Sequence, residues 1–224
     1  MRQSLLFHGL DAEVVDEVLA GARRRTFRRG DVVFHAGDPG DSVQVIARGH
    51  FALRLVTPRG DVCMTRVFGP GDMFGRLALG TIEAVREATV VSLDESETFE
   101  LFRRQLDELR TAHPSVSDAL IALAGLEIRN VSVRLLEALY VDADRRVRRR
   151  LLELGELFRD GSGIPLTQED IAALAGTSRA TVSRVLAEEE RRGTIAKRRR
   201  SIELTDVEEL SRWAAWPDAS TGRS

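Results

Sequence analysis

Cysteine is nearly absent from this 224-residue chain, which carries only Cys63. A single thiol excludes an intramolecular disulfide and any zinc or iron–sulfur site built only from cysteines of one chain. Long apolar runs are also missing, because the longest, residues 119–126, falls well short of the ~18 residues that a membrane-spanning helix needs. The N-terminal apolar segment is too short for a signal peptide and lacks a small-residue cleavage site. We therefore expect a cytoplasmic protein without a membrane partner.

Charge is distributed unevenly along the chain. With 43% hydrophobic and 30% charged residues, the composition is typical of a soluble globular protein, and the net charge is −2. Residues 1–144 nevertheless carry a net charge of −5, whereas residues 145–224 carry +3. Six cations and no acidic residue lie within residues 191–200. This segment indicates a polyanion partner such as nucleic acid, the alternative being a solvated run of charge.

The first hundred residues have the pattern of a short helix followed by many strands. Asp11 can cap a helix whose apolar residues recur at helical spacing. Between Thr26 and about Leu93, apolar runs of strand length are separated by clusters of glycine, proline and aspartate seven to eleven residues apart. Short strands at such even spacing predict an antiparallel β-roll of the jelly-roll kind.

Beyond Pro114 the apolar period becomes helical and predicts one helix over residues 115–139. Such a helix would extend about 37 Å at about 1.5 Å per residue, too long for a small roll to cover. A second copy of the same helix would cover the remainder and form a homodimer, the alternative being burial against the roll. The apolar stripe consists of Leu120, Ala124, Ile128, Val131, Leu135 and Leu139.

The basic C-terminal half contains the pattern of a helix-turn-helix. Thr167 and Asp170 form a capping pair at the start of one helix, and Gly176 suits the left-handed residue that ends it. Ser178 can cap a second helix that extends to about Glu190. Two helices joined by a tight glycine turn are typical of a DNA-binding module, although an ordinary helical hairpin is the alternative.

The outer face of the second helix is expected to enter the major groove of DNA. Arginine can donate two hydrogen bonds to guanine, which makes Arg179 and Arg184 the candidates for reading bases. The hydroxyls of Ser178 and Thr181 suit phosphate oxygens. A hairpin follows, and the cations at its tip can grip the DNA backbone. The expected DNA contacts are Thr167, Ser178, Arg179, Ala180, Thr181, Ser183, Arg184, Lys197, Arg198, Arg199 and Arg200.

These motifs together resemble the Crp/Fnr family of transcription regulators over nearly the whole chain. Residues 166–172 (LTQEDIA) and 178–184 (SRATVSR) are similar to its helix-turn-helix, and residues 37–41 (GDPGD) and 69–75 (GPGDMFG) to its cyclic-nucleotide-binding roll. The resemblance implies an α+β protein that is not an enzyme, with a jelly-roll effector domain (1–114), a dimerisation helix (115–142), a winged helix-turn-helix (143–216) and a tail (217–224). It also implies a homodimer on a palindromic operator and contact with RNA polymerase.

The effector pocket departs from the cyclic-AMP-binding members of the family. Arg76 stands where they carry a glutamate for the ribose hydroxyl, and Glu87 where they carry a phosphate-binding serine or threonine. Val131 precedes Ser132 where they offer adenine a Thr-Ser pair. A carboxylate at position 87 would repel phosphate and could instead pair with Arg86 or Arg76. The candidate pocket comprises Phe74, Gly75, Arg76, Leu77, Ala78, Arg86, Glu87, Ala88, Val131 and Ser132.

These departures disfavour cyclic AMP, so the sequence assigns no definite cofactor. The alternative is a regulator that needs a cyclic nucleotide or another small molecule to bind DNA. The recognition helix departs as well, since relatives of the cyclic-AMP receptor usually carry glutamate where Ala180 stands. That carboxylate can accept a hydrogen bond from cytosine, so a different operator half-site is expected.

Two other classes of protein share a β-roll. A cupin enzyme would need several histidine and carboxylate ligands around a metal, but the four histidines, His8, His35, His50 and His113, are isolated in the sequence. A nucleotide-binding regulatory subunit that acts on a protein partner would not need a helix-turn-helix with a cationic hairpin.

Overall fold

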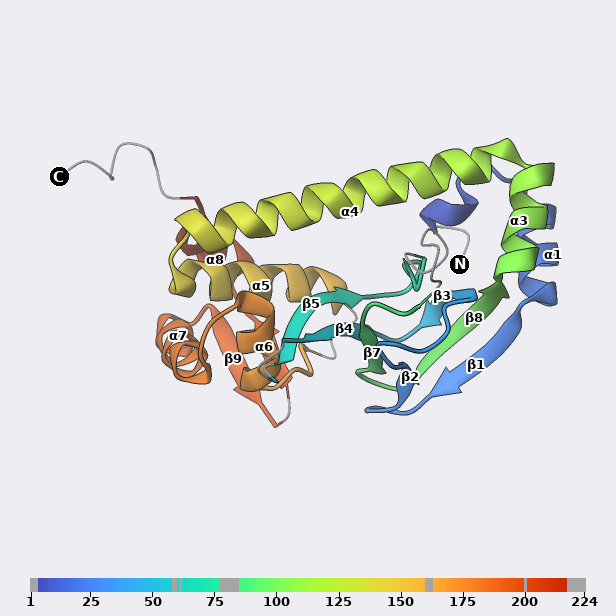
Figure 1. Ribbon diagram of the computed structural model, residues 1–224. Coiled ribbons are helices and arrows are strands. Elements are labelled where there is room, and N and C mark those ends of the chain that lie inside the picture. The colour runs from blue at the N-terminus through green and yellow to red at the C-terminus, as the bar shows by residue number, and fades with distance from the viewer. Residues whose placement is uncertain are drawn as a thin grey trace. The chain divides into compact units, whose positions relative to one another are not determined.

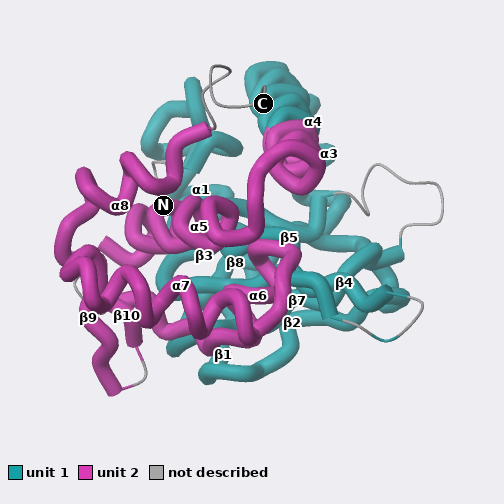
Figure 2. The backbone as a smooth tube through the Cα atoms, turned by 90° about the vertical axis from the view of Figure 1, so that its left-hand side faces the viewer, with its two compact units in different colours: residues 1–129 teal, residues 130–224 magenta. Residues whose placement is uncertain are grey.

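The computed structural model describes residues 4–57, 60, 62–76, 85–159, 163–199 and 201–216 (Figure 1). The chain forms two compact units, residues 1–129 and 130–224, with the division inside the long helix α4 (Figure 2). The first unit contains a β-roll and the second a helix-turn-helix with a hairpin. The predicted α+β class is therefore confirmed. No helix in the described ranges is both long and apolar enough to cross a membrane.

The roll consists of two four-stranded antiparallel sheets, ordered β1-β8-β3-β6 and β2-β7-β4-β5. Their strands are β1 (Arg23–Phe27), β2 (Val32–Phe34), β3 (Ser42–Arg48), β4 (Phe51–Val56), β5 (Val62–Phe68), β6 (Met73–Phe74), β7 (Thr89–Ser92) and β8 (Ser96–Phe102). Strands were expected only as far as Leu93, but β8 lies beyond that residue and pairs with both β1 and β3. It is a central strand, which explains why Ser96, Thr98 and Glu100 are buried with the apolar residues of the core.

A cluster of phenylalanines fills the space inside the roll. The ring of Phe51 lies 5.1 Å from that of Phe74 and 5.6 Å from that of Phe27. Phe74 is almost fully buried in this cluster. Since the rings contact one another from several strands, they fix the position of β6, from which the candidate effector pocket begins.

Helices cover the other face of the first sheet and form a second core. The 3-10 helix η1 (Leu5–Phe7), α1 (Ala12–Gly21), α3 (Arg103–Ala112) and the start of α4 (Pro114–Tyr140) contribute to it. Leu120 and Leu123 pack against this core and are only partly exposed. The assignment of Leu120 to an uncovered dimer stripe is therefore wrong, because its own chain already covers it.

The rest of α4 presents an uncovered apolar face. Ile121 is 71% exposed, Ile128 69%, Leu135 58% and Leu139 64%. Val131 is 58% exposed, and Ala124 is exposed as well. The predicted helix over residues 115–139 is thus present, and Ile121, Ala124, Ile128, Val131, Leu135 and Leu139 are exposed on it.

The last turns of α4 are tied to α5 (Ala143–Leu157) within the second unit. Glu137 is buried on α4 and accepts a hydrogen bond of 2.5 Å from Nε of Arg149 and another from Nη2 of Arg150. Arg134 on α4 pairs with Glu153 on α5 at 3.2 Å. Removing either partner of a buried pair leaves an uncompensated charge, so these contacts hold the two helices together.

The second unit continues with α6 (Gln168–Ala175), α7 (Arg179–Arg192), the hairpin β9 (Ile195–Arg198) and β10 (Ser201–Leu204), and α8 (Val207–Ala214). Val147, Leu151 and Leu154 of α5 are buried, as are the inward residues of α6 and α7. This arrangement confirms the predicted winged helix-turn-helix, with α7 in the position of the recognition helix.

Candidate DNA-binding surface and effector pocket

Capping interactions define the two helices of the helix-turn-helix. Oγ1 of Thr167 accepts from the amide of Asp170 at 3.1 Å, and Oδ2 of Asp170 accepts from the amide of Thr167 at 3.1 Å. Gly176 ends α6 with φ of 60°, a left-handed conformation that favours glycine. Ser178 then caps α7 by accepting from the amide of Thr181 at 3.2 Å. All of these caps were expected from the sequence.

Helix α7 divides cleanly into a buried face and an exposed face. Val182, Val185 and Leu186 are fully buried against the rest of the unit. The residues expected to face the major groove, Arg179, Ala180, Ser183 and Arg184, are all exposed. The arrangement leaves two arginines and two small residues available to a groove that admits an α-helix.

Arg146 holds the turn between α6 and α7, a role that the sequence did not indicate. Its Nε donates to the carbonyl of Ala175 at 3.0 Å, and Nη2 donates to that of Gly176 at 2.9 Å. Nη1 donates to the carbonyl of Val141 at 2.8 Å. These bonds satisfy carbonyls at the C-terminus of α6, where a cation is also favoured by the helix dipole.

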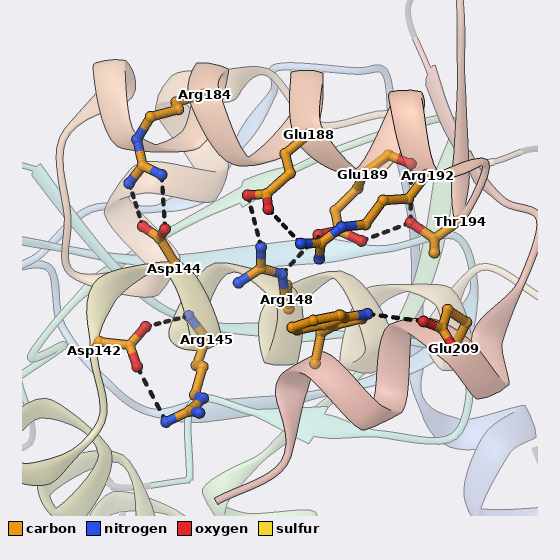
Figure 3. A network of polar contacts seen from close by, with 11 residues as sticks. Asp142, Asp144, Arg145, Arg148, Arg184, Glu188, Glu189, Arg192, Thr194 and Glu209 are labelled. Atoms are coloured by element: carbon orange, nitrogen blue, oxygen red, sulfur yellow. Dashed lines mark hydrogen bonds and ion pairs between the residues drawn. The ribbon is translucent and has the colours of Figure 1, made fainter. Parts of the chain in front are cut away.

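A buried polar network fixes α7 on α5 (Figure 3). Glu189 has no exposed surface and accepts from Arg148 at 2.8 Å, from Arg192 at 3.1 Å and from Thr194 Oγ1 at 2.7 Å. Arg148 also donates to Glu188 at 3.0 Å. The guanidinium of Arg192 lies 4.0 Å from the ring centre of Trp213. A charge buried this deeply is tolerated only because cations and a hydroxyl surround it.

Arg184, one of the two candidate base readers, is held by Asp144 at the start of α5 (Figure 3). Its Nη1 donates to Oδ2 at 2.8 Å and its Nη2 to Oδ1 at 2.5 Å. The bonds from Arg184 hold the pKa of the Asp144 carboxyl below its usual value. Arg179 has only a loose ion pair, at 3.8 Å, with Glu169.

The cations expected to grip the DNA backbone differ in their partners. Lys197 pairs with Glu190 at 2.8 Å and Arg198 with Glu203 at 3.0 Å. Arg199 is exposed at the tip of the hairpin and forms no ion pair with any residue of the described ranges. Arg200 lies outside the described residues. Arg199 is therefore the cation of this group that needs no rearrangement before it contacts a phosphate.

In the roll, Arg86 is committed to internal contacts. Its Nη1 donates to the carbonyls of Ser42 at 2.7 Å and Gly75 at 2.9 Å, and Nη2 donates to Ser42 Oγ at 2.9 Å. Its guanidinium also lies 4.2 Å from the ring centre of Phe34. Burial lowers the pKa of Arg86, against the raising effect of nearby carboxylates. Gly75 has φ of 86°, which strains any other residue, and a Cβ there would lie 2.6 Å from Arg86 Nη1 and displace that guanidinium.

Arg76 bonds to helix α4. Its Nη2 lies 3.0 Å from Oε2 of Glu127, which also accepts from Arg66 at 2.6 Å. Glu87 is exposed. Within the described residues it forms no ion pair with Arg76 or Arg86. The structure instead pairs Arg76 with Glu127 and bonds Arg86 to Ser42 and Gly75.

The remaining pocket candidates are dispersed. Ala88 is buried near the roll core, whereas Leu77 and Ala78 lie outside the described residues. Val131 and Ser132 are exposed on the part of α4 that belongs to the second unit. Within the described ranges, no group of three histidine, cysteine or carboxylate side chains could hold a metal ion. His50 instead contacts Asp94, with 2.6 Å between Nδ1 and Oδ2.

Comparison with protein families gives two matches. The profile of the cyclic nucleotide-binding domain matches residues 24–113, and that of the Crp-like helix-turn-helix domain matches residues 145–213. The cyclic AMP receptor protein of Thermus thermophilus is 37% identical over 189 residues, which cover 83% of this chain and 85% of that protein. A CRP-like cAMP-activated global transcriptional regulator of Mycobacterium tuberculosis is 29% identical over 215 residues, covering 93% and 96% of the two chains.

Solved structures give the same picture of the fold. The crystal structure of the Thermus thermophilus catabolite activator protein is 33% identical and covers 94% of this chain and 98% of that chain, with a TM-score of 0.56. FixK2 from Bradyrhizobium japonicum is 21% identical with a TM-score of 0.75 and covers 87% and 98% of the two chains. At that level of identity the second comparison supports the fold alone.

Proposed function

This chain belongs to the Crp/Fnr family of transcription regulators, and from that premise we propose that it reads a palindromic operator through the exposed face of α7. The observation that carries the proposal is the division of α7, which buries Val182, Val185 and Leu186 while Arg179 and Arg184 stay exposed. Arginine is well suited to guanine because its planar group donates two bonds to O6 and N7. Ser178 and Thr181 at the helix start, together with Thr167, are assigned to phosphate oxygens.

A homodimer follows from the uncovered face of α4. Ile121, Ile128, Leu135 and Leu139 are each more than half exposed, and such a contiguous apolar seam is typical of an interface between protein chains. A second copy of α4 offers a matching seam around a two-fold axis. The dimer then presents two α7 helices to half-sites about one helical turn apart, ~34–36 Å. Contact of the bound dimer with RNA polymerase, and residence in the cytoplasm beside the DNA, are proposed on family membership alone.

The first test selects duplexes from a random pool and compares two arginine variants on the selected site. Arg184→Ala should weaken specific binding roughly 5- to 150-fold per half-site and relax the base preference at one position. Arg199→Ala should weaken binding to selected and random duplexes alike and reduce the salt slope by about 1. Titrations at several salt concentrations provide the measurement. Equal losses on selected and random DNA for both variants would mean that the reading and gripping roles are wrongly assigned.

We also propose that cyclic AMP is not required for DNA binding. A cyclic phosphate would need the Nη donors of Arg86, which already bond to Ser42 and Gly75. The ribose hydroxyl would need an acceptor where Arg76 pairs with Glu127. The carboxylate of Glu87 adds a charge that repels phosphate. The Arg76–Glu127–Arg66 group supplies, without a ligand, a polar bridge between the roll and α4.

Calorimetric titration with cyclic AMP tests this part of the proposal. Each missing hydrogen bond to a buried polar group costs about 1–3 kcal/mol. With the phosphate and ribose contacts both lost, the affinity for cyclic AMP should be at least ~30-fold below that of a complete site. Arg76→Glu alone would place two carboxylates together, so it is combined with Glu127→Arg and Glu87→Ser. That triple variant should gain measurable affinity. Micromolar binding by the unmodified protein, with a matching rise in operator affinity, would instead favour an effector-dependent regulator.

A further inference from the structure

The contact between Arg184 and Asp144 has a geometry that bears on how the base is read. Both terminal nitrogens of Arg184 donate to the carboxylate, at 2.8 and 2.5 Å, in a bidentate ion pair (Figure 3). Asp144 lies in the first turn of α5, just after the capping residue Asp142. The two partners are 40 residues apart in the sequence and come from different helices of the same unit. The pair therefore depends on the packing of α5 against α7.

The edge of Arg184 that Asp144 occupies, formed by Nη1 and Nη2, is one with which arginine can read a guanine. Guanine presents two acceptors, O6 and N7, to the two donors of a guanidinium fork. A carboxylate presents two acceptors to the same fork, with full negative charge. Nη1 and Nη2 cannot make this paired contact with both acceptor groups at once. Asp144 and guanine are therefore alternative partners of this pair of donors on Arg184.

We propose that Asp144 is a positioning residue that withholds Arg184 from DNA by occupying its guanine-reading edge. This inference rests on the proposed role of Arg184 in reading the operator. Specific binding then requires Arg184 to exchange Asp144 for guanine, which leaves the partly exposed Asp144 carboxylate without its cation near the polyanion. Both effects lower the affinity of the unmodified protein for its operator. The ionisation of Asp144 is secure at neutral pH, because its bonds with Arg184 lower the pKa of that carboxyl.

The charges around Asp144 indicate that its main effect is on Arg184 and not on the other cations nearby. Arg148 is the other cation that acts on Asp144, but it is buried and already bonds to Glu188 and Glu189. Arg184 is 60% exposed, and both of its side-chain hydrogen bonds go to Asp144. Loss of Asp144 would thus release one arginine on the exposed face of α7 and leave the buried network of α5 and α7 intact.

A double-mutant cycle on the full-length protein tests the proposal. Asp144→Asn, Arg184→Ala and the double variant are titrated with a duplex selected by the unmodified protein. An exposed ion pair limits binding by about two- to fivefold per half-site, so Asp144→Asn should tighten dimer binding about 4- to 25-fold. In the Arg184→Ala background the same substitution should bring only the smaller gain due to reduced repulsion. Asp144→Glu, which keeps the carboxylate, should stay close to the unmodified affinity.

Controls separate this effect from loss of charge and from unfolding. Glu208→Gln removes an equal charge from α8, where Glu208 pairs with Arg212, and should have little effect on binding. Thermal unfolding of each variant checks that α5 remains folded. Equal gains from Asp144→Asn in both backgrounds would overturn the proposal in favour of phosphate repulsion, and weaker binding would overturn it in favour of a supporting role. Failure of the unmodified protein to retain any duplex would contradict the proposed function itself.

Discussion

A variant with Ile128 and Leu135 both replaced by aspartate is expected to sediment as a monomer and to lose operator binding. The two side chains are 69% and 58% exposed, and a dimer would bury that surface in both copies. Burying a whole Ile or Leu side chain contributes about 1.5–3 kcal/mol. The dimer would bury the exposed part of four such side chains, two from each copy, which together contribute about 4–7 kcal/mol. The dissociation constant of the dimer should therefore rise at least about 1000-fold.

Analytical ultracentrifugation over a range of concentrations provides the measurement. Asn130→Asp serves as the matched control, because Asn130 is exposed on α4 about 200° around the helix from Ile128 and a carboxylate there should leave the dimer intact. The monomeric variant should keep the far-ultraviolet spectrum of a folded protein. An intact dimer of unchanged shape in the double variant would show that another surface forms the interface.

Glu189→Ala is expected to unfold the second unit far more easily than any exposed substitution in α7. Glu189 is completely buried and accepts bonds from Arg148, Arg192 and Thr194. Its removal leaves Arg148 with a buried charge and only the partly exposed Glu188, a loss of about 3–5 kcal/mol in the free energy of unfolding. DNA binding by this variant should be lost at the urea concentrations that unfold the second unit, because α7 loses its attachment to α5.

Tryptophan fluorescence during urea unfolding isolates this unit, since both tryptophans of the chain, Trp213 and Trp216, lie within it. Glu190→Ala is the matched control, because Glu190 is the next residue, is exposed and forms an exposed ion pair with Lys197. Arg148→Met added to Glu189→Leu should recover part of the stability, since apolar replacement of both partners removes the unpaired charge. Equal shifts for Glu189→Ala and Glu190→Ala would contradict the importance of the network.

Local patterns in the sequence were sufficient for the helix-turn-helix and for the long helix. Thr167, Gly176 and Ser178 each act on residues within four positions, and the structure places all three at the predicted helix ends. The apolar period beyond Pro114 likewise predicts one face of a single helix. Interactions of this range depend on backbone geometry alone, so the order of residues is enough to predict them.

Contacts between distant residues could not be predicted in the same way. Arg76 contacts Glu127, 51 positions away, and Arg184 contacts Asp144, 40 positions away. The residues next to each arginine in the sequence do not indicate its partner. The sequence allowed Glu87 to pair with Arg86 or Arg76, but the structure pairs Arg76 with Glu127. Leu120 follows the apolar period but packs partly against the second core, formed by the first sheet and its covering helices, which a periodicity cannot reveal.

The attachment of α4 to α5 through Glu137 has a consequence for the length of the operator spacer. Glu137 joins the end of the dimerisation helix to Arg149 and Arg150, and the buried Arg148–Glu189 pair joins the same α5 to α7. Within residues 130–224, the end of α4 and the helix α7 are thus both attached to α5. Each added base pair shifts a half-site by about 3.4 Å and turns it by about 34–36° around the duplex axis. Because α4 and α7 are both attached to α5 in this unit, we expect the dimer to bind operators with only one helical phase between the two half-sites.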